Sequence, residues 1–318
     1  MQINIFSLNT YFSISDFKSK NKTIVTIGTF DGVHIGHKSI LQKVLQASKN
    51  TNYESVILSF FPHPRMVLDS DSDVKLLNTI DEKSILLKNL GLQHLIIHPF
   101  DTDFANLSAE EFVSHYLVKK LNIHKIIIGH DHRFGKNRTA NIDDLILFGK
   151  KYNFEVAQIS AKEIEQVAVS STKIRQALFD GNIVLAKKYL GYDYFMTGKV
   201  IKGKQLGRTI GFPTANIEIT ENYKLVPENG VYIVSSFLNN QTVFGMMNIG
   251  YNPTFQEKKL SIEIHFLDFE ADLYDQIIQI SVLEFIRKEQ KFEGIDNLKD
   301  QLQKDKNTTS EFIRKQNQ

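Results

Sequence analysis

The first half of the chain alternates short β-rich runs with amphipathic segments. The apolar and β-branched runs that predict strands are residues 23–30, 55–61, 94–100, 125–130 and 154–160. The segments that predict helices are residues 39–48, 81–90, 108–121 and 142–151. Ser108 followed by Glu111 is a capping-box pattern at the start of the third helix. Alternating strands and helices predict a doubly wound α/β domain, with a parallel sheet covered on both faces.

The second half is strand-rich, with Gly, Asn and Pro between the runs. Strand-like runs occupy residues 196–201, 211–219, 230–237, 242–249, 260–267 and 276–285, and a terminal helix is predicted near residues 295–304. Strands without intervening helices predict a small antiparallel β-barrel. The pattern changes between Ala186 and Tyr194, so we expect domains at residues 1–186 and 187–318. The polar tail from Lys304 is expected to be solvated and partly frayed.

Composition narrows the class of protein. The 318 residues are 42% hydrophobic, which suits two buried cores. With 38 basic and 36 acidic side chains the formal charge is only +2, so the chain lacks the basic field typical of nucleic-acid binders. Cysteine is absent, which excludes disulfides and cysteine-based zinc sites. The N-terminus does not match a secretory signal, and no apolar run approaches the roughly 18 residues of a membrane helix. We therefore expect a cytoplasmic protein without membrane or nucleic-acid partners.

Residues 28–37, Gly-Thr-Phe-Asp-Gly-Val-His-Ile-Gly-His, join the first predicted strand to the first predicted helix, and we call them the histidine turn. Backbone N–H groups at the positive end of a helix bind phosphate oxygens well. Gly36 lets the backbone approach phosphates, and the spacing of His34 and His37 places both rings on one side of the turn. The tetrapeptide 34–37 matches the HxGH signature of nucleotidyltransferases that split ATP between its α- and β-phosphates. The alternative is an ordinary turn with two solvent-exposed histidines.

Two further motifs in the first half have a chemical interpretation. Phe61-Pro62-His63-Pro64-Arg65 ends a predicted strand and forms a rigid loop with an aromatic ring, suited to stacking on a flat ligand. Residues 171–175, Ser-Thr-Lys-Ile-Arg, begin a helix and gather hydroxyls, amides and a cation at its N-terminal end. Each has a purely structural alternative, namely a proline-stiffened strand exit and an ordinary capped helix.

Three patterns in the second half also point to phosphate chemistry. Residues 211–216, Gly-Phe-Pro-Thr-Ala-Asn, place Thr214 and Asn216 on one face of a strand, where their oxygens suit Mg²⁺. Glycines at 198, 203, 207 and 211 lie within a basic stretch that fits a mobile flap over phosphates. The pattern of a P-loop does not occur in the sequence. Glu263 lies on an alternating strand, where a solvent-exposed carboxylate is the plain alternative.

Taken in order, these motifs resemble bacterial bifunctional FAD synthetases, in which riboflavin kinase is joined to FMN adenylyltransferase. The resemblance covers nearly the whole chain and also includes residues 129–135, 245–248, 250–255 and 272–274. It implies ATP-dependent phosphorylation of riboflavin to FMN, then adenylylation of FMN by ATP to FAD with release of pyrophosphate. It also implies that riboflavin, FMN and ATP are the small-molecule partners and that Mg²⁺ is required.

For the first domain, the resemblance implies that His34 and His37 stabilise charge on the phosphates rather than act as general bases. The ATP-binding residues it implies are Gly28, Thr29, Phe30, Gly36, Ser171, Thr172 and Arg175. The flavin-binding residues it implies are Phe61, Pro62, Asp131 and Arg133. His132 stands where the family usually has an aromatic residue, and Ala168 where it often has arginine. We therefore expect Lys173 or Arg133 to supply triphosphate contacts.

For the second domain, the resemblance implies that Glu263 accepts or orients the proton of the riboflavin 5′-hydroxyl. The ATP-binding residues it implies are Gly203, Lys204, Gly211, Thr214 and Asn216, of which Thr214 and Asn216 also hold the metal. Arg287, Glu289 and Phe292 stand where the family has flavin contacts, so the resemblance implies that they bind the flavin. A commonplace Arg–Glu pair before a helix is the alternative.

Three other functions remain to be weighed. An aminoacyl-tRNA synthetase also uses a His-x-Gly-His turn, but it needs a tRNA-binding surface that the near-neutral charge does not favour. A flavin-binding regulatory module would keep both folds and lose turnover. A single-activity riboflavin kinase would keep Glu263 and have an impaired adenylyltransferase.

Overall fold

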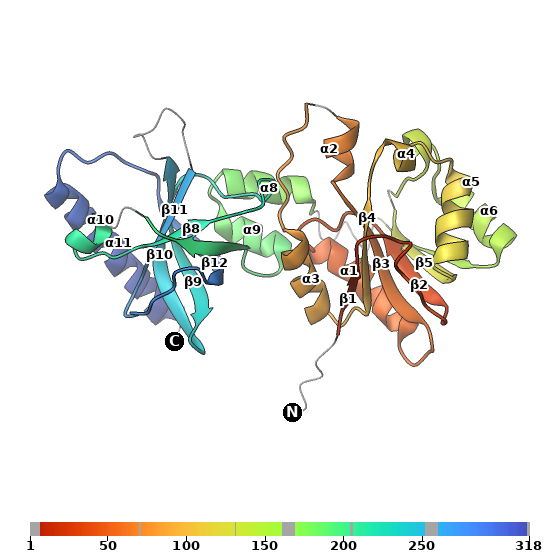
Figure 1. Ribbon diagram of the computed structural model, residues 1–318, viewed down its shortest axis with the longest axis horizontal. Helices are drawn as coiled ribbons and strands as arrows, with labels where there is room; N and C mark the ends of the chain where they lie inside the picture. The colour runs from red at the N-terminus through yellow and green to blue at the C-terminus, as the bar shows by residue number, and fades with distance from the viewer. Residues whose placement is uncertain are drawn as a thin grey trace. The chain divides into compact units, whose positions relative to one another are not determined.

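The chain divides into two compact units, Met1–Ser171 and Thr172–Gln318 (Figure 1). The structure, a computed structural model, describes residues 7–69, 71–130, 132–160, 169–203, 206–251 and 260–316. The division falls earlier in the chain than residue 186, because helix α8 (Ser171–Phe179), from Thr172 on, and helix α9 (Ile183–Leu190) group with the second unit. In that unit α9 packs against strand β12 (Ile277–Arg287).

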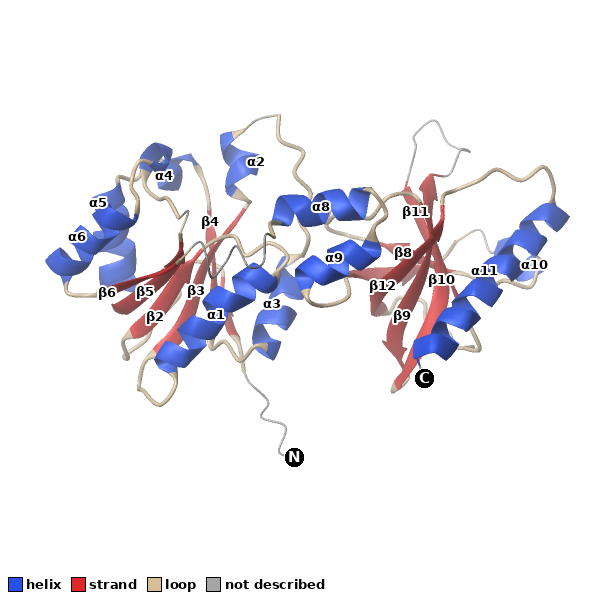
Figure 2. Cartoon of the chain, turned by 180° about the vertical axis from the view of Figure 1, so that it is seen from behind, coloured by secondary structure: helices blue, strands red, loops and turns tan. Residues whose placement is uncertain are grey.

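The first unit is built on a six-stranded parallel sheet (Figure 2). In spatial order its strands are β1 (Asn9–Tyr11), β4 (His94–Pro99), β3 (Glu54–Phe61), β2 (Thr23–Ile27), β5 (Ile123–Gly129) and β6 (Glu155–Ile159). The predicted parallel sheet is confirmed, and β1 is an additional edge strand. The strand order reverses between β2 and β5, and in doubly wound folds ligands bind beyond the carboxyl ends of the strands at this position.

Helices cover both faces of this sheet because successive side chains of each strand point to opposite sides. Ile24 of β2 packs with Val44 of α1 (Ile35–Ser48). The next residue, Val25, belongs to the core that includes Leu117 of η1 (Phe112–Lys120) and Leu145 of α6 (Ile142–Tyr152). Helix α3 (Ile80–Asn89) lies on the same face as α1, since Leu41 and Leu87 share one core. Shorter helices are α2 (Pro64–Leu68), α4 (Thr102–Ala105) and η2 (Lys136–Arg138).

The helix predicted at residues 108–121 forms with a change of hydrogen-bond spacing. The capping box is present, because the Ser108 N–H donates to Glu111 Oε2 at 2.9 Å and the Glu111 N–H donates to Ser108 Oγ at 3.2 Å. The helix begins as α5 (Ala109–Glu111) and continues as the π-helix η1. Its last bond runs from the Leu121 N–H to the Tyr116 carbonyl, five residues back.

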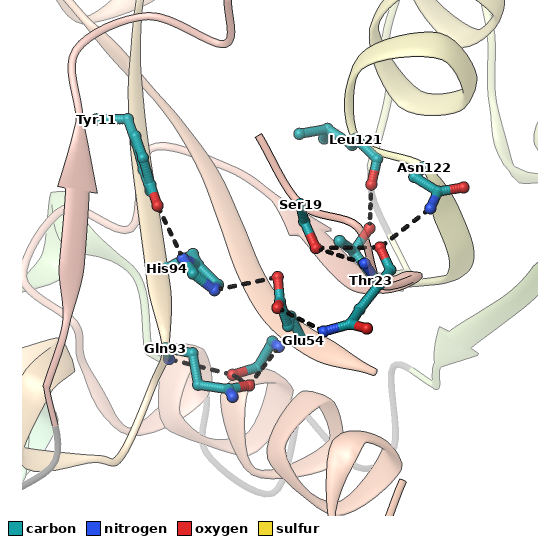
Figure 3. A network of polar contacts seen from close by, with 10 residues as sticks. Tyr11, Ser19, Thr23, Glu54, Gln93, His94, Leu121 and Asn122 are labelled. Atoms are coloured by element: carbon teal, nitrogen blue, oxygen red, sulfur yellow. Dashed lines mark hydrogen bonds and ion pairs between the residues drawn. The ribbon is translucent and has the colours of Figure 1, made fainter. Parts of the chain in front are cut away.

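A polar network joins the amino ends of the strands, opposite the end where the histidine turn leaves β2 (Figure 3). His94 is hydrogen-bonded to the Tyr11 hydroxyl at 3.3 Å and lies 3.3 Å from Oε2 of Glu54. Asn21 donates to the other carboxylate oxygen of Glu54 at 2.9 Å. These bonds attach the edge strand β1 and the segment before β2 to the centre of the sheet.

The second unit is a closed antiparallel barrel with a terminal helix, as predicted. Its strands follow the order β10 (Gln241–Tyr251), β11 (Leu260–Phe266), β8 (Ala215–Glu218), β7 (Phe195–Ile201), β12 and β9 (Gly230–Leu238). Along β11 the buried Ile262 and Ile264 alternate with the partly exposed Ser261, Glu263 and His265. The second set therefore lies on the outer face of the barrel.

The terminal helix α11 runs over Ile295–Gln316, so the expectation of a frayed end from Lys304 is wrong. Asp305 is 1% exposed, and Thr309, one turn later, is fully buried. The guanidinium of Arg287, at the end of β12, donates to both carboxylate oxygens of Asp305 at 2.8–3.0 Å. This buried, bidentate ion pair and the buried polar face hold the second half of the helix in place.

Candidate active sites

The histidine turn connects β2 to α1 at the carboxyl edge of the sheet. The Gly28 N–H donates to the Leu58 carbonyl of β3 at 3.1 Å, and the chain then leaves the sheet. Phe30 and Val33 have positive φ angles of 46° and 34°, which are strained for residues with side chains and which recur at functional sites. His34 is the N-cap of α1, and its Nδ1 accepts a hydrogen bond from the His37 N–H at 3.3 Å.

The two imidazole rings lie against each other, as their spacing predicts. The rings of His34 and His37 are stacked with centroids 3.6 Å apart and an interplanar angle of 16°. Phe30 closes one side, with its ring centroid 5.0 Å from that of His37. A Cβ atom on Gly36 would lie 3.3 Å from two atoms of the His34 ring, so a larger residue here would displace that ring.

Burial keeps both rings neutral in the free protein. It lowers the pKa of His34 to about 4. Burial also lowers the pKa of His37 well below its usual value, and the charge of Lys83, or a proton on His34, acts in the same direction. Nδ1 of His37 is buried and has no hydrogen-bond partner among the described residues. Buried polar atoms without a partner in the protein are uncommon, and a catalytic role or a bound water or ion accounts for many of them.

Three side-chain contacts fix the backbone of the turn. The Asp31 carboxylate is buried and accepts a hydrogen bond from the Leu77 N–H at 2.9 Å. The Ser171 hydroxyl donates to the Asp31 carbonyl at 2.9 Å, so this predicted ATP-binding residue lies at the histidine turn. Lys83 of α3 donates from Nζ to the Thr29 carbonyl at 2.7 Å.

The predicted flavin loops leave the sheet on either side of the histidine turn, because β3 and β5 both flank β2. Phe61 ends β3 and is followed by a cis peptide bond to Pro62. Arg133 is exposed in the loop after β5. Asp131, predicted to contact flavin, and Ala168 lie outside the described residues.

The second site lies on the outer face of the barrel, where β8, β11 and β10 run side by side. Asn216 and Glu263 are opposite each other in the β8–β11 pairing. The Thr214 hydroxyl donates to Oε2 of Glu263 and the Ser261 hydroxyl donates to Oε1, both at 3.2 Å. The prediction that Thr214 and Asn216 share a face is therefore confirmed. Asn248 of β10 is paired with Glu263 on the other side and extends the polar row.

The glycine-rich segment that precedes β8 approaches this row closely. A Cβ atom on Gly203 would lie only 2.1 Å from Nδ2 of Asn216, so the backbone here rests directly on the amide. Gly211 has a φ angle of 86°, which favours glycine. Lys204 lies outside the described residues.

The oxygen atoms of the row fit a hard divalent cation. Thr214 offers a hydroxyl, Asn216 an amide oxygen and Glu263 a carboxylate. Within the described part of the chain, no group of three or more His, Cys, Asp or Glu residues is placed to hold a metal. A cation at this row would therefore have the neutral oxygens of Thr214 and Asn216, the single Glu263 carboxylate beside them, and substrate phosphates, and one carboxylate with phosphates is a common arrangement for Mg²⁺.

Comparison with known proteins identifies the family. The FAD synthetase family model matches residues 16–173, and the riboflavin kinase family model matches residues 190–313. The bifunctional riboflavin kinase/FMN adenylyltransferase of Listeria monocytogenes is 37% identical over 294 residues, covering 92% of this chain and 93% of that protein. The protein of the same name from Escherichia coli K12 is 37% identical over 291 residues, covering 91% and 92%. The chain belongs to the bifunctional riboflavin kinase/FMN adenylyltransferase family.

Membership of this family confirms the resemblance drawn from the motifs. The enzyme makes FMN from riboflavin and then FAD from FMN, using ATP in both reactions. A crystal structure titled as a macrolide-efflux protein from Streptococcus pneumoniae is also similar, with a TM-score of 0.84 and 30% identity. The match covers 95% of this chain and 98% of that one. Within the described ranges, the structure contains no helix long and apolar enough to cross a membrane.

The structure gives Arg287 a partner that the sequence did not indicate. Its guanidinium pairs with Asp305 of α11 rather than with Glu289. The Glu289 carboxylate instead lies over Gly250, where a Cβ atom would be 1.9 Å from Oε1. Flavin contacts by Arg287 and Glu289 stay a prediction.

Three polar residues close to the sites were not singled out from the sequence. They are Lys83 at the histidine turn, Asn248 in the polar row, and His265. The Nδ1 atom of His265 lies 2.8 Å from the Pro213 carbonyl, and its ring packs edge-on against Phe212. The alternation of β11 could have indicated His265, because it shares a strand face with Glu263.

Proposed function

We propose that the histidine turn carries the adenylyltransferase reaction and that the polar row around Glu263 carries the kinase reaction. The observation that supports the first assignment most is the stacked, buried His34–His37 pair at the switch point of the sheet, where Nδ1 of His37 has no partner among the residues that the structure describes. For the second it is the Glu263 carboxylate held by Thr214 and Ser261 beside Asn216.

In the adenylyltransferase reaction, an oxygen of the FMN phosphate attacks the α-phosphorus of ATP and pyrophosphate leaves. The attacking phosphate is already anionic, so the protein positions the groups and stabilises charge. His34 and His37 donate ring N–H groups to phosphate oxygens as charge moves toward the leaving group. The other residues proposed to bind ATP are Gly28, Thr29, Phe30, Gly36, Ser171, Thr172 and Arg175. The residues proposed to bind flavin are Phe61, Pro62, Asp131 and Arg133.

In the kinase reaction, the 5′-hydroxyl of riboflavin attacks the γ-phosphorus of ATP and ADP leaves. Glu263 orients the hydroxyl and accepts its proton as the new P–O bond forms. Thr214 and Asn216 would hold Mg²⁺, which supplies positive charge to the phosphates. Gly203, Lys204 and Gly211 are proposed to line the ATP phosphates, and Arg287 and Glu289 to contact the flavin.

We also propose that the enzyme acts in the cytoplasm on small molecules alone. The formal charge of +2 supports the absence of a nucleic-acid partner.

The test is a pair of variants that separates the two reactions. Full-length enzyme is incubated with riboflavin, ATP and Mg²⁺, or with FMN, ATP and Mg²⁺, and the flavins are separated by chromatography over time. His37→Ala should abolish FAD formation from FMN and spare FMN formation from riboflavin, and Glu263→Gln should do the reverse. Loss of both activities in both variants, with unfolding transitions unchanged, would overturn the division into two sites.

A further inference from the structure

A charged side chain lies under the histidine turn. Lys83 is 6% exposed, although lysine is rarely buried without a dedicated partner. Its place is fixed by the start of α3, where Thr79 and Glu82 form a capping box. From there the ammonium group reaches the Thr29 carbonyl at 2.7 Å, inside the segment that carries His34 and His37.

Asp31 compensates this charge from within the turn. Its carboxylate is 2% exposed and attracts Lys83 electrostatically. The same carboxylate accepts the Leu77 N–H at 2.9 Å, just before α3. The turn and the start of α3 are therefore joined by two reciprocal bonds, one from a side chain of each segment to the backbone of the other.

Lys83 also acts on His37. Burial is the largest influence that disfavours a proton on His37, and the groups that act in the same direction are His34 from the turn, when it is itself protonated, and Lys83 from α3. Burial lowers the pKa of Lys83, whereas the attraction of Asp31 raises it. Asp31 therefore helps to keep Lys83 positively charged near the buried ring of His37.

We propose that Lys83 is a positioning residue for adenylyl transfer, which fixes the Thr29 carbonyl and whose positive charge adds to the burial that keeps the His37 ring neutral. The inference rests on the proposed function of the histidine turn. Lys83 acts here through the turn, so its loss should affect the rate of the step more than the binding of ATP.

The experiment compares Lys83→Met, which keeps the aliphatic chain, with Lys88→Met, an exposed lysine on the same helix. Each full-length variant is assayed for FAD formation from FMN, with kcat and the KM for ATP determined separately. FMN formation from riboflavin is measured in the same samples as a control that each variant is present as folded, full-length enzyme. The His37 ring is titrated by NMR in protein labelled with ¹³C-histidine, and His37→Ala assigns the signal.

We expect Lys83→Met to lower the kcat of FAD formation at least tenfold, to change the KM for ATP less than threefold and to leave FMN formation unchanged. Its His37 signal should titrate at a higher pH than in the wild-type enzyme, whereas Lys88→Met should match the wild type. An unchanged kcat, or a lower kcat with an unmoved His37 titration, would overturn the proposal. If His37→Ala itself still makes FAD, the proposed function of the turn fails instead.

Asp31→Asn keeps a side-chain oxygen that can accept the Leu77 N–H. This variant tests the role of Lys83 if Lys83→Met does not fold. Without the Asp31 charge, Lys83 loses its electrostatic partner, so we expect a kcat for FAD formation at least tenfold lower. An Asp31→Asn enzyme with wild-type kcat would contradict the role of the charged pair.

Discussion

The Thr214 hydroxyl donates a 3.2 Å hydrogen bond to Oε2 of Glu263, from the residue before β8 to the middle of β11. The bond fixes one carboxylate oxygen, and Ser261 holds the other. The orientation of the proposed catalytic carboxylate thus depends on two hydroxyl groups that contribute no charge.

Thr214→Val keeps the shape of the side chain and removes this bond. A hydrogen bond to a charged group contributes about 1.5–3 kcal/mol, so the kcat of FMN formation should fall by roughly 10- to 150-fold. Steady-state kinase assays measure the effect. Thr220→Val, which removes an exposed hydroxyl bonded to Glu221, is the control and should be silent. Equal activity of the Thr214 and Thr220 variants would argue against a role of the bond in catalysis.

Gly203→Ala should impair the kinase because its Cβ atom would lie 2.1 Å from the Asn216 amide. Either the flap or the amide must then move, and we expect the KM for ATP in FMN formation to rise at least tenfold. FAD formation from FMN should stay at the wild-type rate. Gly294→Ala is the matched control, because a Cβ atom there meets no atom within 4 Å. A normal KM in the Gly203 variant would mean that the flap does not line the ATP site.

The free energy of unfolding should fall as the pH drops from about 6.5 to about 4. Burial lowers the pKa of His34 to about 4, so in this window the unfolded chain binds a proton that the folded chain does not. The full shift corresponds to about 3 kcal/mol. Urea unfolding at several pH values measures the slope. His34→Asn keeps an N-cap and removes the titrating group, so its slope should be shallower. An equal slope in both proteins would show that His34 does not carry the effect.

Asp305→Asn should destabilise the second unit because it leaves the Arg287 guanidinium partly buried without a counter-charge. Breaking a buried pair in this way costs about 3 kcal/mol. Asp275→Asn, which breaks the exposed Lys199–Asp275 pair, should cost less than about 1 kcal/mol. Urea unfolding of the full chain compares the two variants. Similar midpoints would indicate that α11 does not depend on the ion pair.

The helices and strands could be predicted where their signal lies in residues that are close together in the sequence. The residues of β2 are all β-branched and all buried because helices cover both of its faces. Strand β1 has only three residues and owes its conformation to pairing with β4, which no local pattern reveals. The capping box marked the start of the helix at Ser108. The five-residue hydrogen-bond spacing of η1, however, could not be seen in the hydrophobic periodicity of the sequence.

The sites were partly predictable for the same reason. His34 and His37 lie in one short motif, and Thr214 and Asn216 alternate on one strand, so spacing alone indicates their common face. Lys83 looks like any surface lysine on a helix. Its position one turn before the buried Leu87 is the signal that could have indicated burial. The sequence of the second half of α11 is polar and therefore predicts exposure to solvent. The burial of Asp305 could not be predicted because its partner, Arg287, comes from β12.

The two units protect their backbones from other chains in different ways. The edges of the parallel sheet are β1 and β6, which have only three and five residues. The described strands of the second unit close into a barrel, so each is paired on both sides. Long unpaired edge strands are the usual templates for intermolecular β-pairing, and short edges and closed barrels suppress it. The described strands of the folded chain therefore offer few free edges on which aggregation through strand addition can begin.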